Sequence, residues 1–414
     1  MSSESPDLKA ASRCTALLVA SYVPWPLDRG DPMRVFGLSS RIAQSFQSEL
    51  FSVRRPEGGE TDGLRVAFPD PVQLFVRSGG PLPRIMGKAW PWIAGMLTLL
   101  PPQIADRRSH AMAAELRRVA PRFDVVVLFG ERAGVYAPAV RASTLVVWDK
   151  SNVLGASALD HNPLQPIRRR LVVWLCRRFE RRVLSQVDWT IVTCQPEAER
   201  LSEIYGRPPN DIIPSGVPVP DSVDGKRRSN VVGWMGQFRY RPNAEGLKRF
   251  LVEGWPVCSA RGLMLELAGP DSPDDELRSI IKQSQNVTVL GFVEDLNPWL
   301  HSLGSAVVPL WSGAGVKLKS LSFMAAAVPV VGTACAAEGI AKEDATPIIL
   351  SEDPAGLAKH LVDLAGNIEL ASLHGAHGRD LVMEQYSWDI VAGQYVKSIE
   401  RAMLAVRRKP RTSS

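Results

Sequence analysis

Two glycines, two lysines and a serine lie close together in the second half of the chain and could bind an anion. Gly313 and Gly315 are followed by Lys317, Lys319 and Ser322. Glycines before a helix leave backbone N–H groups uncovered, and the helix N-terminus adds partial positive charge. We expect Lys319 in the first helical turn, with Ser322, three residues later, on the same face. The cluster is therefore suited to bind a diphosphate group.

The segment that carries this cluster has the pattern of a strand, a loop, a helix and a second strand. The apolar run 306–308 predicts a buried strand, and small residues then form the loop. Residues 318–324 have apolar side chains at helical spacing, and Pro329 must end that helix. Residues 330–331 begin a β-branched run that is short enough for a buried parallel strand. We expect a βαβ unit with the loop at the start of its helix.

Other candidate residues follow predicted strands elsewhere in the chain. Strands are predicted at residues 15–22, 124–128, 145–148, 230–235 and 287–290. Open parallel sheets bind ligands just past the carboxyl ends of their strands. The residues at these ends are Gly30, Gly130, Glu131, Arg132, Asp149, Lys150, Ser151, Gly236, Arg239, Gly291, Phe292 and Val293.

Three of the candidates have an alternative structural role. The planar guanidinium of Arg239 is suited to two phosphate oxygens at once, but it could instead brace its own loop. Asp149 could act in the site or cap a helix or brace a loop. Lys317 could bind a ligand or be a solvated residue at the start of a helix. The residues alone leave these alternatives open.

These features resemble the donor-site motif of glycosyltransferase family 4. Its members have the GT-B fold, an α/β architecture of two Rossmann-like domains that face each other across a cleft. In these relatives a glycine-rich loop, a basic residue and a Lys precede Glu-Ala-Met-Ala-x-Gly-x-Pro-Val-Val, and Ala-Glu-Gly follows. This chain has Gly313, Gly315, Lys317, Lys319, Ser-Phe-Met-Ala-Ala-Ala-Val-Pro-Val-Val at 322–331 and Ala-Glu-Gly at 337–339. The segment 236–246 is most similar to bacterial exopolysaccharide-type sugar transferases.

The resemblance implies sugar transfer from a nucleotide-sugar donor with retention of anomeric configuration. The sequence has no Asp-x-Asp unit of the kind that indicates a metal-dependent glycosyltransferase, so no metal ion is expected. No resident cofactor is expected, because the nucleotide sugar is a co-substrate. The catalytic residues implied are Asp149, Lys319 and Arg239. The donor-binding residues implied are Gly30, Arg34, Gly236, Gly291, Phe292, Val293, Gly313, Ala314, Gly315, Val316, Lys317 and Ser322.

Two positions depart from the family motif. Ser322 stands where relatives have the Glu that commonly holds the nucleotide ribose, and Ala314 stands where they have an acidic residue. The first departure concerns how the nucleotide is bound, and the second concerns the sugar. They keep a second interpretation open, namely a catalytically degenerate protein that binds sugar nucleotides. A phosphorylase-like or epimerase-like activity on the same fold is a third interpretation.

Length and motif order predict two domains, since 414 residues are more than a single hydrophobic core usually contains. The expected boundaries are a disordered N-terminus at 1–13, an acceptor-binding Rossmann-like domain at 14–217, a linker at 218–229, a nucleotide-sugar-binding Rossmann-like domain at 230–385, a helix crossing back to the first domain at 386–406 and a disordered tail at 407–414.

Composition indicates the cellular compartment and the kinds of molecule that the protein binds. Five scattered cysteines without a close pair predict free thiols, and no His, Cys or carboxylate cluster has metal-ligand spacing. No secretory signal is evident, and the apolar stretch 89–100 falls short of the roughly 20 residues that span a bilayer. We therefore expect a cytoplasmic protein. The net charge of +6 suits anionic partners, but no nucleic-acid-binding pattern is present.

An arginine-rich helix is predicted at 168–182, with seven arginines around an apolar stripe. Such a helix is either a solvated face or a surface that docks on the inner face of a membrane or on an anionic acceptor. Trp90 and Trp92 are compatible with a core helix or with an acceptor-binding or membrane-facing wall. The tryptophans and the arginine-rich helix favour a lipid-linked glycan as the acceptor, while the departures at Ser322 and Ala314 would also suit a small natural product.

Overall fold

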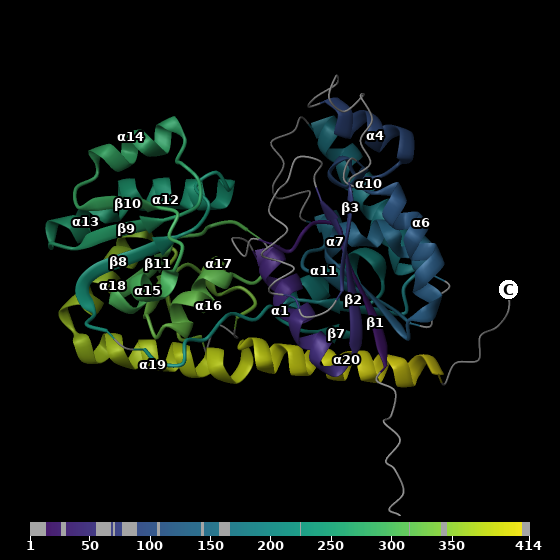
Figure 1. Cartoon of the computed structure of the whole chain (residues 1–414). Helices are drawn as coiled ribbons and strands as arrows, with labels where there is room; N and C mark the ends of the chain where they lie inside the picture. Colours follow the sequence, from purple (N-terminus) through teal and green to yellow (C-terminus); the bar gives the residue numbers. More distant parts are fainter. Residues whose placement is uncertain are drawn as a thin grey trace, which may run out of the picture.

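The computed structural model describes residues 14–25, 30–54, 68, 71–76, 89–105, 108–141, 145–156, 166–223, 225–313, 315–340 and 346–407. Figure 1 shows two α/β units side by side, each built on its own twisted sheet. The last helices run along the base of both units. The segments 1–13 and 408–414, which were expected to be disordered, lie outside the described residues.

The first unit holds a parallel sheet of seven strands in the order β3-β2-β1-β4-β5-β6-β7. Its side chains alternate between two apolar clusters, with Leu17 and Val19 in one and Ala16 and Leu18 in the other. Both faces are buried, which explains the nearly continuous apolar runs in the sequence. The strands are β1 Thr15–Ala20, β2 Gln47–Arg54, β3 Val72–Val76, β4 Val125–Phe129, β5 Val146–Lys150, β6 Trp189–Val192 and β7 Asp211–Ile212.

The second unit holds a parallel sheet of six strands in the order β10-β9-β8-β11-β12-β13. Each sheet contains a point where the strand order reverses, between β1 and β4 in the first and between β8 and β11 in the second. Ligands of such sheets bind beside this point. The strands are β8 Arg228–Met235, β9 Met264–Ala268, β10 Val287–Gly291, β11 Leu303–Val308, β12 Val330–Gly332 and β13 Ile349–Leu350.

Helices cover both faces of the two sheets (Figure 1). Those of the first unit are α1 Gly30–Ser45, α4 Trp90–Thr98, α5 Pro102–Ala105, α6 His110–Val119, α7 Gly130–Ala133, α8 Ala137–Val140, α10 Pro166–Leu184 and α11 Gln195–Tyr205, with short 3-10 turns at Ala120–Arg122 and Gly134–Tyr136. Those that follow are α12 Arg241–Glu253, α13 Trp255–Ala260, α14 Asp275–Gln283, α15 Leu296–Ser302, α16 Leu318–Ala325, α17 Ala334–Ala337, α18 Pro354–Gly366, α19 Ile368–Gln385 and α20 Trp388–Arg407.

The chain crosses between the units twice, and the two crossings lie side by side. The N–H of Val217 donates a hydrogen bond to the carbonyl of Tyr386 at 2.9 Å. After this point α20 packs on α1, and Trp388 is buried in the core of the first unit. A Cβ atom on Gly37 of α1 would lie 2.5 Å from the Trp388 ring, so only glycine permits this approach. The last helix is thus an integral part of the first unit.

No helix among the described residues combines the length and apolar character that crossing a membrane requires.

Candidate functional site

The glycine-rich loop between β11 and α16 has a backbone that only glycine adopts readily. Gly313 has a φ of 129° and Gly315 a φ of 76°. The Lys317 ammonium folds back onto this loop and donates hydrogen bonds to the carbonyls of Gly313 at 3.3 Å and Gly315 at 2.7 Å. It also pairs with Glu338 at 3.0 Å. Lys317 therefore braces the loop and is not directed at a ligand, while Ala314 lies outside the described residues.

The Lys319 amine lies at the point where the second sheet reverses its strand order. It donates a hydrogen bond to Oδ1 of Asn243 at 2.6 Å and lies 5.4 Å from the centre of the Trp234 ring. A Cβ atom on Gly236 would lie 2.8 Å from this amine, so the turn after β8 needs a glycine to approach it. The structure thus brings two predicted residues, Lys319 and Gly236, into contact.

The Lys319 amine has no carboxylate partner among the described residues to compensate its charge. Its hydrogen-bond partner is the neutral amide of Asn243. Burial, and then the nearby charge of Lys317, lower the pKa of the Lys319 amine to about 7. An anion bound here would restore the charged form and gain an ionic contact.

The turns at the ends of β8, β9 and β10 lie next to one another. The N–H of Gly236 donates to Ala268 at 3.0 Å, and the N–H of Gly269 donates to Gly291 at 2.9 Å. The ring of Phe292 follows immediately and is 65% exposed, so it is free to stack on a planar ligand group. Val293 instead packs partly against the apolar core.

Arg239 lies on the same edge, but its side chain points into solvent. Its backbone N–H donates to Oδ2 of Asp271 at 2.9 Å, and the N–H of Phe238 donates to Oδ1 at 2.7 Å. Asp271 therefore holds the turn, and no contact from the residues that the structure describes positions the exposed guanidinium of Arg239. Its predicted phosphate contact would require the side chain to swing toward the loop.

Two residues predicted to act on the ligand, Arg34 and Asp149, form a buried ion pair. Arg34 Nε donates to Oδ2 of Asp149 at 2.8 Å, and Nη2 donates to Oδ1 at 2.6 Å. The two side chains are 2% and 1% exposed, and the remaining Arg34 donors reach carbonyls of Ile213 and Pro214. Both Asp149 oxygens are therefore occupied in the interior. The structure gives this pair a positioning role, holding the end of β5 to the segment after β7.

Among the acidic residues at the carboxyl ends of β4 and β5, Glu131 has the pKa that is shifted most. It follows β4 in the short helix α7, and its Oε1 accepts a hydrogen bond from the N–H of Asn152 at 2.5 Å. Burial, and then the nearby carboxylate of Asp31, raise the pKa of Glu131 to about 7. Its position after a predicted strand marked it as a candidate, but no family motif assigned it a role.

The two units meet at the glycine-rich loop. A Cβ atom on Gly315 would lie 3.2 Å from Oδ1 of Asn152, and one on Gly30 would lie 3.2 Å from the side chain of Leu318. The N-terminus of α1 therefore faces the N-terminus of α16. Gly339 approaches Cys194 in the same way and also touches Val316, which packs partly into the core.

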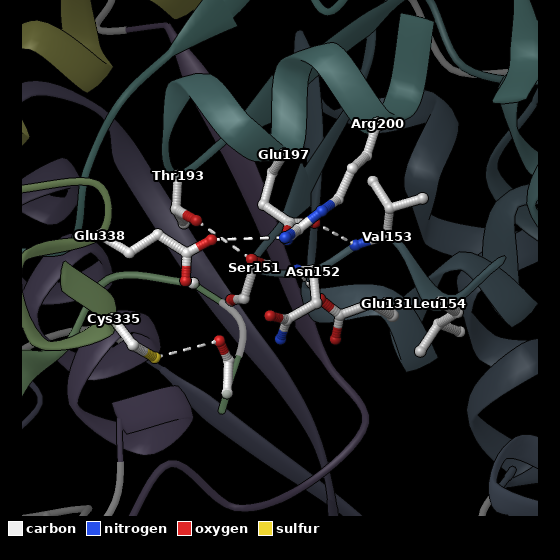
Figure 2. A network of polar contacts seen from close by, with 12 residues as sticks. Glu131, Ser151, Asn152, Val153, Leu154, Thr193, Glu197, Arg200, Cys335 and Glu338 are labelled. Atoms are coloured by element: carbon white, nitrogen blue, oxygen red, sulfur yellow. Dashed lines mark hydrogen bonds and ion pairs between the residues drawn. The ribbon is translucent and has the colours of Figure 1, made fainter. Parts of the chain in front are cut away.

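A chain of charged groups spans this interface, as Figure 2 shows. Glu197 accepts a hydrogen bond from the N–H of Val153 at 2.6 Å and pairs with Arg200. Arg200 Nη2 in turn contacts Oε1 of Glu338 in the second unit at 3.3 Å, and the other Glu338 oxygen pairs with Lys317. The first unit is thereby connected to the glycine-rich loop through alternating charges.

Ser322 lies on α16, one turn after Lys319, and is partly buried. Its side chain makes no polar contact within the described residues, so its hydroxyl remains available. Within the same residues, no group of three or more His, Cys, Asp or Glu side chains is arranged to hold a metal ion.

Both halves of the chain match family models. Residues 34–216 match the model described as glycosyl transferase 4-like domain, and residues 229–367 match the model described as glycosyl transferases group 1. Together these matches cover most of both units. No curated protein sequence is significantly similar to the chain.

Solved structures share the whole fold at low sequence identity. Sucrose-phosphate synthase from Thermosynechococcus elongatus has a TM-score of 0.66 at 17% identity, over 95% of this chain and 100% of that chain. The Anabaena protein HepE in complex with UDP and glucose has a TM-score of 0.65 at 14% identity, over 93% and 99%. A glycosyltransferase from Rickettsia africae has a TM-score of 0.63 at 10% identity, over 96% and 100%. These similarities confirm the predicted two-domain GT-B fold.

Proposed function

We propose that this chain, which belongs to the glycosyltransferases of the GT-B class, transfers a sugar from a nucleoside-diphosphate sugar to an acceptor hydroxyl group. The single observation that carries the proposal is the uncompensated Lys319 amine beside the glycine-rich loop and the Gly236 turn. A cation without a carboxylate partner, at the switch point of a parallel sheet, is suited to a diphosphate. The related fold of HepE in complex with UDP-glucose supports a uridine nucleotide as the first donor to test.

The departing diphosphate is the group on which negative charge grows during transfer. The backbone N–H groups of Gly313 and of residues 315–317, the N-terminus of α16 and the Lys319 ammonium would stabilise that charge. Because these fixed dipoles and this cation face the leaving group, we expect transfer to proceed without an added metal ion. Retention of anomeric configuration is proposed from the family resemblance.

The exposed Phe292 ring and the turn that it follows are proposed to hold the base of the nucleotide. The acceptor would enter from the first unit, at the ends of β4 and β5. Glu131 is the titratable group there whose pKa lies near neutrality, so it can hold or release a proton at working pH. We assign the acceptor to a lipid-linked glycan or a small natural product.

A second candidate function is sugar-nucleotide binding without turnover. The observation that favours it is Ser322, which replaces the motif Glu and makes no polar contact within the described residues. The two functions differ in the release of free nucleotide from the donor. An enzyme adapted to serine loses or changes its activity in Ser322→Glu, whereas a degenerate protein has no turnover in either form.

A thermal-unfolding panel of UDP-, GDP-, dTDP-, CDP- and ADP-sugars tests the proposal. A ligand that binds only the folded state at about 100 times its Kd raises the free energy of unfolding by roughly 2.7 kcal/mol, which shifts the midpoint visibly. We expect one nucleotide class to stabilise the protein. Cooperative unfolding at an unchanged midpoint with every donor would contradict donor binding.

A further inference from the structure

Helix α10 exposes apolar side chains along one stripe, although its opposite face is fully packed. Ile167, Leu171 and Trp174 lie at spacings of four and three residues and are 82%, 39% and 51% exposed. Phe179 and Val183, by contrast, are buried in the core of the first unit. A helix whose outer face serves only solvation has no need for three large apolar groups in water.

Six arginines surround this stripe and carry uncompensated charge. All six are exposed, and none pairs with a carboxylate in the part of the chain that the structure describes. The guanidinium of Arg178 lies 5.8 Å from the ring of Trp174, which joins the cationic and apolar parts of the surface. These arginines are Arg168, Arg170, Arg177, Arg178, Arg181 and Arg182.

Helix α4, which lies beside the C-terminal part of α10, also exposes apolar side chains. Met96, Leu97 and Leu99 are 65%, 77% and 46% exposed. The two helices are neighbours, because Thr98 at the end of α4 and Arg182 near the end of α10 line the same hollow. Figure 1 places both helices at the same end of the first unit.

We propose that α10 and α4 form a docking surface for an anionic membrane leaflet. Arginine side chains would contact lipid phosphates, while the exposed apolar side chains would enter the boundary between head groups and acyl chains. A nucleic acid could pair with the arginines, but it offers little apolar surface to cover Ile167, Met96 and Leu97. The combination of both kinds of side chain on one surface therefore favours lipid. This inference goes beyond the transfer reaction and stands whichever acceptor is used.

Co-sedimentation of the full chain with vesicles tests the docking surface without requiring turnover. The probes are vesicles of phosphatidylcholine alone and vesicles that contain about one third phosphatidylglycerol. We expect binding to the anionic vesicles only. A variant with Arg168, Arg170, Arg178 and Arg181 changed to Gln should bind at least about tenfold more weakly, because each arginine near an anionic surface contributes to the affinity.

A matched control removes the same charge from exposed positions of the second unit. In this control Arg261, Arg278, Lys282 and Lys359 are changed to Gln. It should bind vesicles like the unmodified protein, and all variants should unfold at similar midpoints because the changed side chains are exposed. Equal loss of binding in both variants, or no binding of the unmodified protein, would overturn the proposal.

The apolar contribution is tested separately at constant charge. Ile167→Ser combined with Leu97→Ser should weaken vesicle binding by about tenfold. If this variant binds vesicles unchanged while the protein also binds the soluble polyanion heparin through the α10 arginines, the surface recognises acidic macromolecules and the membrane proposal is wrong.

Discussion

Arg200 of the first unit contacts Glu338 of the second unit at 3.3 Å, and Glu338 uses its other oxygen to hold Lys317. The glycine-rich loop is therefore connected through one carboxylate to the opposite unit. Figure 2 shows the contact between Arg200 and Glu338. A change in the spacing of the two units would therefore alter the position of the loop that we propose binds the donor.

The first prediction concerns this connection. Arg200→Gln removes the ion pair with Glu338 and also the ion pair with the buried carboxylate of Glu197, so the protein should stay folded with a free energy of unfolding that is lower by about 1–3 kcal/mol. Nucleotide affinity should fall by about fivefold, because the arrangement in which the units meet is less favoured. Calorimetric titration measures the affinity, and Arg278→Gln on the remote helix α14 is the control. Equal affinities for the Arg200 variant and the control would contradict a coupling role.

The second prediction concerns protons taken up with the ligand. The pKa of Lys319 is lowered to about 7 in the free protein, so the amine is mostly neutral at pH 8. Diphosphate binding favours the charged form, so binding should take up a proton and the affinity should decline between pH 7 and 9. Titration in buffers of different ionisation enthalpy measures this uptake. Its persistence in Lys319→Met would assign the proton to another group.

Lys319 also affects the free protein. Because its folded pKa lies below the unfolded value, the unfolded state binds more protons above pH 7, and this group makes stability rise with pH from about 7 to 10.

The third prediction separates positioning from catalysis at Asp149. Asp149→Asn leaves the buried guanidinium of Arg34 without a counter-charge and should lower the free energy of unfolding by about 3–5 kcal/mol. Denaturant unfolding measures the loss, and the double variant Arg34→Met with Asp149→Leu should recover part of it. An Asp149→Asn protein with unchanged stability and lost turnover would instead return Asp149 to a catalytic role.

The fourth prediction concerns Glu131. Its folded pKa of about 7 lies above the ordinary value, so the folded state binds more protons than the unfolded state between about pH 4.5 and 7. Above pH 7 the charged carboxylate therefore lowers the free energy of unfolding. Glu131→Gln should stabilise the protein by about 1–3 kcal/mol at pH 8 and much less at pH 5. Thermal unfolding at both pH values measures this difference, and equal effects at the two would contradict the raised pKa.

The two parallel sheets and the glycine-rich loop were predictable from the sequence because buried parallel strands are continuous apolar runs. The predicted strand at 145–148 is observed as Val146–Lys150. It continues through Asp149 and Lys150 because their charges are neutralised in the interior by Arg34 and Glu180. These partners are 115 and 30 residues away, so no local pattern could reveal them.

The same limit applies to the site. Lys319 and Gly236 were both candidates, but their contact depends on strand order, which brings β8 and β11 together. Lys317 matched the motif as well as Lys319 did, yet its amine bonds to carbonyls of its own loop and to Glu338. Spacing placed both lysines at the start of a helix, and only the packing of the loop distinguishes them.

The central claim is that Lys319 binds the diphosphate of the donor. Its most direct test is calorimetric titration, at pH 7, of the nucleoside diphosphate whose sugar form gives the largest thermal stabilisation. Lys319→Met, which keeps most of the length of the side chain but removes its charge, should bind at least about tenfold more weakly, since a charged hydrogen bond contributes about 1.5–3 kcal/mol. Lys282→Met, at an exposed position on α14, should bind like the unmodified protein. Unchanged affinity in a folded Lys319→Met protein would contradict the account.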